Sequence, residues 1–203
     1  GDSPTADRRQ RKKSRTRLDL VEAAVRLFGE RGFAGTTVQD ITDAADVSPR
    51  TFFRYFASKE DVLFSEHGQS VAELVGQLAR CPADEPLLVS VREAILAIAR
   101  RFEARPEYYL MRGRIMSETP SVAACALHIQ QDWIRVIARA LGERLGVDPH
   151  ADLRPTLIAG AANAAIRSAL VVWEASHGRA SLQGLVLEAF ELLESGFGLA
   201  AGE

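Results

Sequence analysis

The sequence predicts an all-helical protein with about nine helices, in which a small N-terminal domain is joined to a larger helical domain. Apolar residues recur at three- and four-residue steps, and no alternating strand pattern competes with them. Prolines at 82, 86, 106, 120, 149 and 155 separate long apolar-periodic segments. The 203 residues, 47% of them hydrophobic, are enough to bury a sizeable core.

Charge is distributed unevenly along the chain. Residues 1–60 contain 12 Lys and Arg against 9 Asp and Glu, a net charge of +3, although the whole chain has a net charge of −2. The segment Arg8–Arg17 holds seven basic residues and no acidic one. This distribution suggests a polyanionic partner for the N-terminal part, although a basic run of this kind is also common as a solvated surface.

The N-terminal part divides into an arm and four helices. Residues 1–14 are expected to form a basic flexible arm, because they are polar and lack apolar periodicity. A first helix should run from Arg15 to about Gly32 with an apolar stripe of Leu18, Val21, Val25 and Phe28. Capping signals then start three helices: Thr37 with Asp40 for 38–45, Ser48 and Pro49 for 49–56, and Ser58 with Asp61 for a longer helix from Lys59.

The rest of the chain is expected to form helices over 87–104, 106–118, 120–146, 152–177 and 181–197. The predicted domains are the arm (1–14), a helix-turn-helix domain (15–60) and a larger helical domain (61–203). The helices at 38–45 and 49–56 fit a helix-turn-helix whose second helix can lie in a DNA major groove. A plain helical hairpin has the same spacing.

The stretch Leu18–Leu63 resembles the DNA-binding domain of the TetR family of bacterial transcriptional regulators. At the family's spacing it has Ala23, Leu27-Phe28, Gly32-Phe33, Thr36-Thr37, Ile41, Val47-Ser48, Thr51, Tyr55-Phe56 and Ser58-Lys59-Glu60. It departs from the usual pattern at Asp46, where Gly often closes the helix, at Thr42 in place of Ala, and at Phe53 in place of Tyr.

The resemblance implies a ligand-responsive regulator, most simply a repressor, that binds a palindromic double-stranded DNA operator as a dimer and is released by a small molecule. Thr37 and Lys59 would contact phosphates at helix N-termini, and Arg50 would read a base or contact the backbone. The implied DNA-binding residues are Arg15, Arg17, Thr37, Ser48, Pro49, Arg50, Thr51, Arg54, Tyr55 and Lys59.

The resemblance also places a homodimer interface on helices 152–177 and 181–197. Small residues at 159–162 and at 164 and 165 permit close helix packing, and the last helix carries an apolar stripe of Leu182, Leu185, Val186, Phe190 and Leu193. Packing within one chain is the alternative. The candidate residues for the pocket of the unknown effector are Phe102, Tyr109, Met116, His128, Trp133, Asn163 and Arg167. Asn163 and Arg167 could instead lie at the dimer interface, where Arg167 would pair with an acid.

Other function classes have weaker signals. Cys81 and Cys125 stand alone, which argues against a disulfide or metal framework and favours a reduced, cytoplasmic setting. No nucleophile elbow, Walker loop or metal-ligand spacing is present, so no cofactor is expected, and an all-helical enzyme is the less favoured alternative from another function class. No apolar run approaches the length needed to span a bilayer. A DNA-binding thiol sensor using Cys81 or Cys125 stays open as an alternative.

Overall fold

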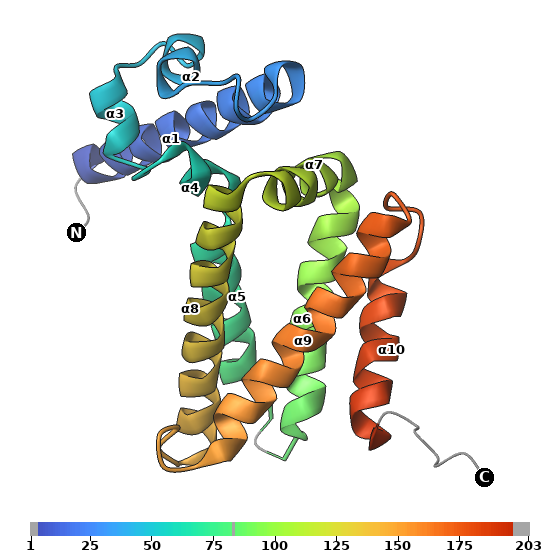
Figure 1. Ribbon diagram of the computed structural model, residues 1–203. Helices are drawn as coiled ribbons and strands as arrows, with labels where there is room; N and C mark the ends of the chain where they lie inside the picture. Colours follow the sequence, from blue (N-terminus) through green and yellow to red (C-terminus); the bar gives the residue numbers. More distant parts are fainter. Residues whose placement is uncertain (1–3, 83, 197–203) are drawn as a thin grey trace. The chain divides into compact units, whose positions relative to one another are not determined.

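The computed structural model describes residues 4–82 and 84–196, with side chains from residue 13 onward, and within these ranges it contains helices and no strands. Ten helices form two compact units (Figure 1). The N-terminal unit comprises residues 1–65 together with 115–125, and the C-terminal unit comprises 66–114 together with 126–203. The all-helical prediction is confirmed. The compact units differ from the predicted division at residue 60, because 115–125 group with the N-terminal residues.

In the N-terminal unit, α1 (Pro4–Arg31) packs against α2 (Val38–Ala44) and α4 (Lys59–Leu63), and α2 packs against α3 (Pro49–Phe53). The three predicted caps are present. Thr37 and Ser58 each form a capping box with an Asp three residues later, and Ser48 caps α3. These local signals fix where α2, α3 and α4 begin.

Two expectations for α1 are wrong. The helix starts at Pro4, so residues 4–14 are helical rather than a flexible arm, whereas residues 1–3 lie outside the described chain. Proline at the first helical position is a favourable start, because its missing N–H has no partner there. The buried face of α1 is also rotated from the predicted stripe: Leu18 is 52% exposed and the core contains Leu20, Ala23, Ala24, Leu27 and Phe28.

The predicted long helix from Lys59 is interrupted. α4 ends at Leu63, residues 64–66 form turns, and α5 (His67–Arg80) follows. No Gly or Pro marks this interruption in the sequence. The break coincides with the boundary between the two units.

The C-terminal unit is built on α6 (Leu87–Ala104), α9 (Leu153–Ala175) and α10 (Leu182–Glu194), with α10 against both α9 and α6, and α5 against α6. α7 (Pro106–Glu118) and α8 (Pro120–Leu145) contribute to both units. The observed bounds match the predicted ones to within three residues. The last predicted residue, 197, lies outside the described chain.

The expectation that no segment is long and apolar enough to span a bilayer does not hold for α9. By length and composition alone α9 passes that test, as the core helix of a soluble protein also can. Its buried residues include Ala159, Ala162, Ala165 and Trp173, which pack inside the unit.

Candidate nucleic-acid interface

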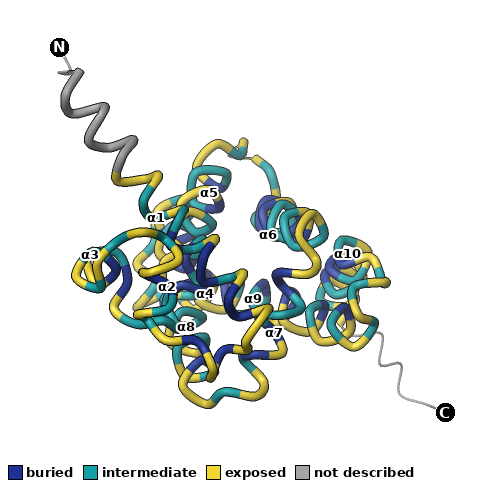
Figure 2. Tube along the Cα trace, turned by 90° about the horizontal axis from the view of Figure 1, so that it is seen from above, coloured by how far each residue is buried: buried dark blue, intermediate teal, exposed yellow. Residues whose placement is uncertain are grey.

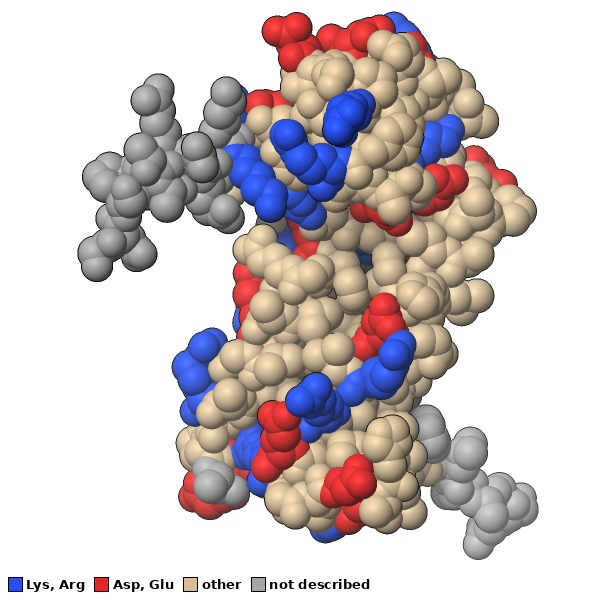
Figure 3. Space-filling model, turned by 90° about the vertical axis from the view of Figure 1, so that its left-hand side faces the viewer, with Lys and Arg blue, Asp and Glu red and all other residues tan. Residues whose placement is uncertain are grey.

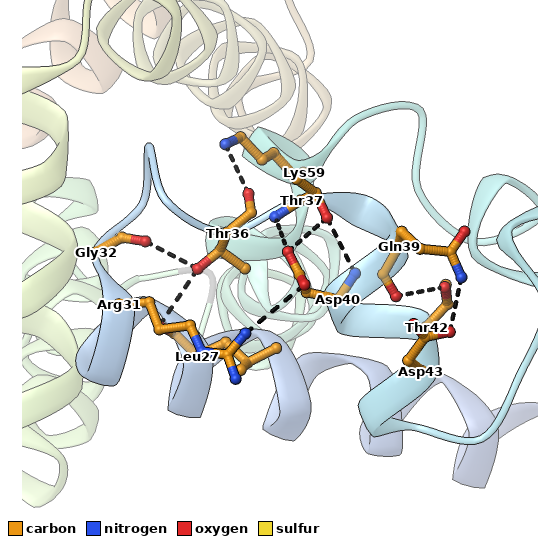
Figure 4. Close-up of polar contacts among 10 residues, drawn as sticks. All are labelled: Leu27, Arg31, Gly32, Thr36, Thr37, Gln39, Asp40, Thr42, Asp43 and Lys59. Carbon is orange, nitrogen blue, oxygen red and sulfur yellow. Dashed lines mark hydrogen bonds and ion pairs between the residues drawn. The ribbon is translucent and has the colours of Figure 1, made fainter.

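The loop between α1 and α2 is fixed by buried and capping hydroxyl groups (Figure 4). The Thr36 side chain is fully buried and donates from Oγ1 to the carbonyl of Gly32 at 2.8 Å. Thr37 accepts from the Asp40 backbone N–H at 3.1 Å, and the Asp40 carboxylate accepts the Thr37 N–H at 2.8 Å. The Thr37 hydroxyl also donates to the Asp40 carboxylate at 2.5 Å, and this hydrogen bond, together with the one from the Thr37 N–H, lowers the pKa of Asp40. The N-terminus of α2 is therefore held by a local network.

Lys59 closes the same loop from α4. Its Nζ donates to the carbonyls of Phe33 at 2.8 Å and Thr36 at 2.9 Å, and lies 4.3 Å from the centroid of the Phe33 ring. The resemblance implied a phosphate contact for this residue. In the structure two of its three donors are already used inside the unit, so Lys59 holds the loop that begins α2.

Buried apolar side chains anchor α3, which packs against α2. Ile41 and Phe52 are fully buried, and Phe56 is nearly so. The Phe52 ring lies 5.4 Å from both Phe53 and Phe56, measured between centroids. Ser48 accepts from the Thr51 N–H at 3.2 Å, and Pro49 occupies the first helical position. With one face of α3 fixed in this way, its other face is exposed (Figure 2).

The exposed face of α3 carries two arginines. Arg50 is exposed and has no hydrogen bond or ion pair within the described part of the chain. Arg54 lies with its guanidinium carbon 5.0 Å from the Tyr55 ring centroid and donates to the Tyr55 hydroxyl at 3.3 Å. Figure 3 shows several Lys and Arg side chains close together on the face that is turned toward the viewer. This surface has the charge and the helix that a DNA groove requires.

The two arginines implied on α1 differ from each other. Arg15 is 78% exposed and pairs with Asp19 at 2.9 Å, which leaves it accessible. Arg17 donates to the backbone carbonyl of Ser65, and its guanidinium carbon lies 5.4 Å from the Phe56 ring centroid. Arg17 thus joins α1 to the end of α4 inside the unit.

The candidate pocket residues are only partly brought together. Phe102 and Tyr109 stack with their centroids 3.7 Å apart. Trp133 is buried and Asn163 is half-buried, but Arg167 is exposed. Met116 falls in the N-terminal unit. His128 is 79% exposed, with its Nε2 3.6 Å from the Asp132 carboxylate, so it lies on the surface and not in the expected pocket.

Sequence reasoning missed the charged groups around this aromatic pair. Tyr109 donates to the Glu66 carboxylate at 2.8 Å, and Arg105 pairs with the same carboxylate. The guanidinium carbon of Arg112 lies 5.0 Å from the Phe102 centroid and 4.8 Å from that of Tyr109. The i, i+3 spacing of Tyr109 and Arg112 signals one helix face. Nothing local to Glu66 signals its partners.

Within the cluster of Glu66, Arg105, Tyr109 and Arg112, the pKa values of Glu66 and Tyr109 are shifted in opposite directions. Burial acts to raise the pKa of Glu66, but the Tyr109 hydrogen bond and the charges of Arg105 and Arg101 hold it below its ordinary value. Burial and the Glu66 carboxylate raise the pKa of Tyr109. Glu66 is therefore ionised and Tyr109 is a neutral donor at pH 7.

The cysteines and possible metal ligands give no further site. Cys125 donates weakly to Asp61 at 3.7 Å, and burial together with that carboxylate raises its pKa to about 11. A thiol of this kind is a poor nucleophile at neutral pH, so the thiol-sensor alternative gains no support from Cys125. Cys81 donates to the Gln77 carbonyl at 3.3 Å. Over the described ranges, His, Cys, Asp and Glu side chains form no group that could hold a metal ion.

Comparison with known proteins matches both parts of the chain. The family described as bacterial regulatory proteins, tetR family, matches residues 20–66, and the MftR C-terminal domain matches residues 85–198. The chain is 34% identical over 156 residues to the HTH-type transcriptional regulator TcmR of Streptomyces glaucescens, covering 74% of this chain and 69% of TcmR. It is 31% identical over 143 residues to the Mycobacterium tuberculosis protein named as a mycofactocin biosynthesis transcriptional regulator, MftR, covering 70% and 72% of the two chains.

Solved structures share the fold. Thermus thermophilus FadR, described as a transcriptional repressor in complex with lauroyl-CoA, superposes with a TM-score of 0.62 at 25% identity, covering 92% of this chain and 97% of FadR. A regulator from Syntrophomonas wolfei superposes with a TM-score of 0.61 at 18% identity, over 94% and 99% of the two chains.

Proposed function

Because the chain belongs to the TetR family of bacterial transcriptional regulators, we propose that it is a ligand-responsive repressor. In this proposal a homodimer places two α3 helices in successive major grooves of a palindromic operator. A small molecule bound in the C-terminal unit then favours a conformation that releases DNA. The protein performs no chemistry on its effector.

The exposed face of α3 carries this proposal. Ser48 and Pro49 start a short helix, Phe52 anchors it, and Arg50 is left as an exposed cation without an internal partner in the described chain. A guanidinium in this position can bond bidentately to guanine in the major groove. Arg54 and Tyr55 supply a second cation and a hydroxyl on the same short segment.

An unpartnered apolar face supports the dimer. On α9, Leu153 is 71% exposed and Leu157 is 62% exposed, and Val171 and Val172 are also exposed near the other end of the helix. On α10, which packs against α9, Leu187 and Leu192 are each 41% exposed. An open groove of about 790 Å³ is lined by Pro149–Leu153, Thr156, Leu157 and the small residues 160, 161 and 164. Exposed apolar surface of this extent marks an interaction site.

The dimer face differs in detail from the stripe read from sequence. Leu182, Val186 and Phe190 are fully buried within the unit, where they form intramolecular core. They are therefore unavailable to a second copy, and the proposed interface uses the opposite faces of α9 and α10.

The test is selection of bound duplexes from random DNA, followed by fluorescence anisotropy on the recovered sequence. Arg50→Ala should lose about 5- to 150-fold in affinity for that sequence and little for unrelated DNA. Arg139→Ala, which also removes an exposed arginine but from the C-terminal unit, is the matched control and should bind as the wild type does. Equal behaviour of the two variants would contradict the assignment of α3.

The effector arm of the test adds lauroyl-CoA, the compound bound in the Thermus thermophilus structure. Release of the recovered duplex would assign acyl thioesters as the effector class. DNA binding that persists at all lauroyl-CoA concentrations would reject that class, and a metabolite extract would then be added in its place.

A further inference from the structure

The chain passes between its two units three times, and the first passage is the one without a continuous helix. The crossings lie at 65/66, at 114/115 within α7 and at 125/126 within α8. At the first, α4 has ended at Leu63 and α5 has not begun. Ser65 and Glu66 therefore sit in a turn, where backbone dihedrals can change without breaking a helix.

Each of these two residues is held by its own unit. On one side, the carbonyl of Ser65 accepts from Arg17 of α1, and Ser65 is buried. On the other, the Glu66 carboxylate accepts from the Tyr109 hydroxyl of α7 at 2.8 Å and pairs with Arg105. Only one planar peptide bond separates the two anchors, so a displacement of one anchor reaches the other through the few backbone dihedrals of this turn.

The Glu66 side chain does not stabilise the start of α5, and it points to a buried residue rather than to solvent. Glu66 is the N-cap residue of α5, but its side chain makes no capping hydrogen bond. Instead it reaches Tyr109, which is 3% exposed and whose ring stacks on Phe102 with an interplanar angle of 8°. The carboxylate is thus bound to an aromatic group buried within the C-terminal unit.

From this arrangement we propose that Glu66, Tyr109 and Arg105 form a junction latch, and that Glu66 is the residue that couples the two units. The proposal rests on DNA binding by α3. When DNA fixes the N-terminal unit, Arg17 holds Ser65, and Glu66 passes the restraint to the end of α6 and the start of α7. Thermodynamic coupling is reciprocal. If DNA changes the affinity for a molecule that binds at Tyr109 or Arg105 by a given factor, that molecule changes the affinity for DNA by the same factor.

Hydrogen–deuterium exchange of the full chain, with and without the duplex recovered by selection, tests the latch without an identified effector. In the wild type, DNA should slow amide exchange across residues 99–114 by about fivefold or more, the lower end of ordinary allosteric coupling. Glu66→Ala should abolish this change and still bind the duplex within about threefold of the wild type, because the side chain neither caps α5 nor lies on the α3 face. Tyr109→Phe, which removes only the hydroxyl, should reduce it.

Glu73→Gln is the matched control, because it also breaks an ion pair within the C-terminal unit, that of Glu73 on α5 with Arg101 on α6, and leaves the Glu66 side chain in place. It should keep the DNA-induced change. The latch is overturned if Glu66→Ala and Tyr109→Phe keep the wild-type change, if Glu73→Gln loses it equally, or if wild-type protein binds DNA with no change at 99–114. A protein that binds no DNA by anisotropy would instead contradict the proposed function, and the latch with it.

Discussion

At the scale of single residues, Lys59 differs most from its expected role. Its ammonium group is bonded to the carbonyls of Phe33 and Thr36 and lies over the Phe33 ring. A charged donor shared by two carbonyls stabilises the loop that begins α2. We therefore expect Lys59 to contribute to DNA binding mainly indirectly, through the position of the α2 N-terminus.

We therefore expect Lys59→Met, which keeps the apolar stem, to lower the free energy of unfolding by about 2 kcal/mol, since hydrogen bonds from charged donors are worth roughly 1.5–3 kcal/mol. Thermal and urea unfolding would measure it. Arg26→Met is the control, because Arg26 makes only an exposed pair with Glu30 at 3.8 Å. Unchanged stability together with a salt slope reduced by about 0.9 would restore the phosphate-contact assignment.

Cys125 gives a second prediction at this scale. Burial and Asp61 raise the pKa of its thiol to about 11, so the reactive thiolate is scarce at neutral pH. In a Cys81→Ser background, the rate of alkylation by iodoacetamide should rise with pH toward a midpoint near 11. Replacing Asp61 by Asn should move that midpoint down. A midpoint at or below the ordinary thiol value would reopen the thiol-sensor alternative.

The sign of this shift also sets a pH window for stability. Because the folded pKa exceeds the unfolded one, the protonated thiol stabilises the fold at pH values below about 9, and this contribution is lost as the pH rises toward 11.

Two of the three departures from the family pattern have a local structural explanation. Asp46 adopts a φ of 52°, and the N–H groups of Asp46 and Val47 donate to the carbonyls of Asp43 and Thr42. This is the backbone pattern of a Schellman helix end, and Asp tolerates its left-handed residue better than most side chains. Thr42 satisfies its buried hydroxyl by donating to the Gln39 carbonyl at 3.0 Å. Phe53 is 57% exposed.

At the scale of elements, the sequence predicts helix ends better than helix faces. Thr37, Ser48 and Ser58 each accept from the N–H group three residues later, so their caps are visible in the sequence. The face of α1 is decided by α2 and α4, whose positions no local pattern gives. The interruption after Leu63 depends likewise on distant partners, namely Arg17 for Ser65 and Tyr109 for Glu66.

The same distinction separates the two faces of α9 and α10. Ala159, Ala162 and Ala165 are small residues at helical spacing, and the structure buries them inside the unit. The exposed Leu153 and Leu157 are equally apolar in sequence. Periodicity identifies apolar positions, but only the packing of α6 against α9 and α10 tells which of them are left for a partner.

Leu157→Glu should therefore convert the proposed dimer into a monomer, because two buried carboxylates near a twofold axis would lose solvation and repel each other. Light scattering after size exclusion would measure the mass, and circular dichroism should show an unchanged helix content. Leu127→Glu is the control, since Leu127 on α8 is 60% exposed and the substitution adds the same charge. A dimeric Leu157→Glu protein would place the interface elsewhere.

At the scale of the whole molecule, the net charge of −2 conceals an N-terminal region with a net charge of +3. One such region neutralises few phosphates. A second copy of the chain doubles the number of phosphate contacts, although each copy makes the same contacts as before. Dimerisation through α9 and α10 would therefore set the salt dependence of DNA binding, although these helices touch no DNA in the proposed arrangement.

The salt dependence of binding tests that link. The logarithm of affinity falls with the logarithm of salt concentration by about 0.9 per phosphate contact, so the wild-type dimer on the full palindrome should give twice the slope of monomeric Leu157→Glu on a single half-site. Anisotropy titrations at several salt concentrations would measure both slopes. Leu127→Glu should keep the wild-type slope, because it adds the same charge and stays dimeric. Equal slopes for the dimer and the monomer would mean that one α3 helix alone engages DNA, and the twofold arrangement on the operator would then be wrong.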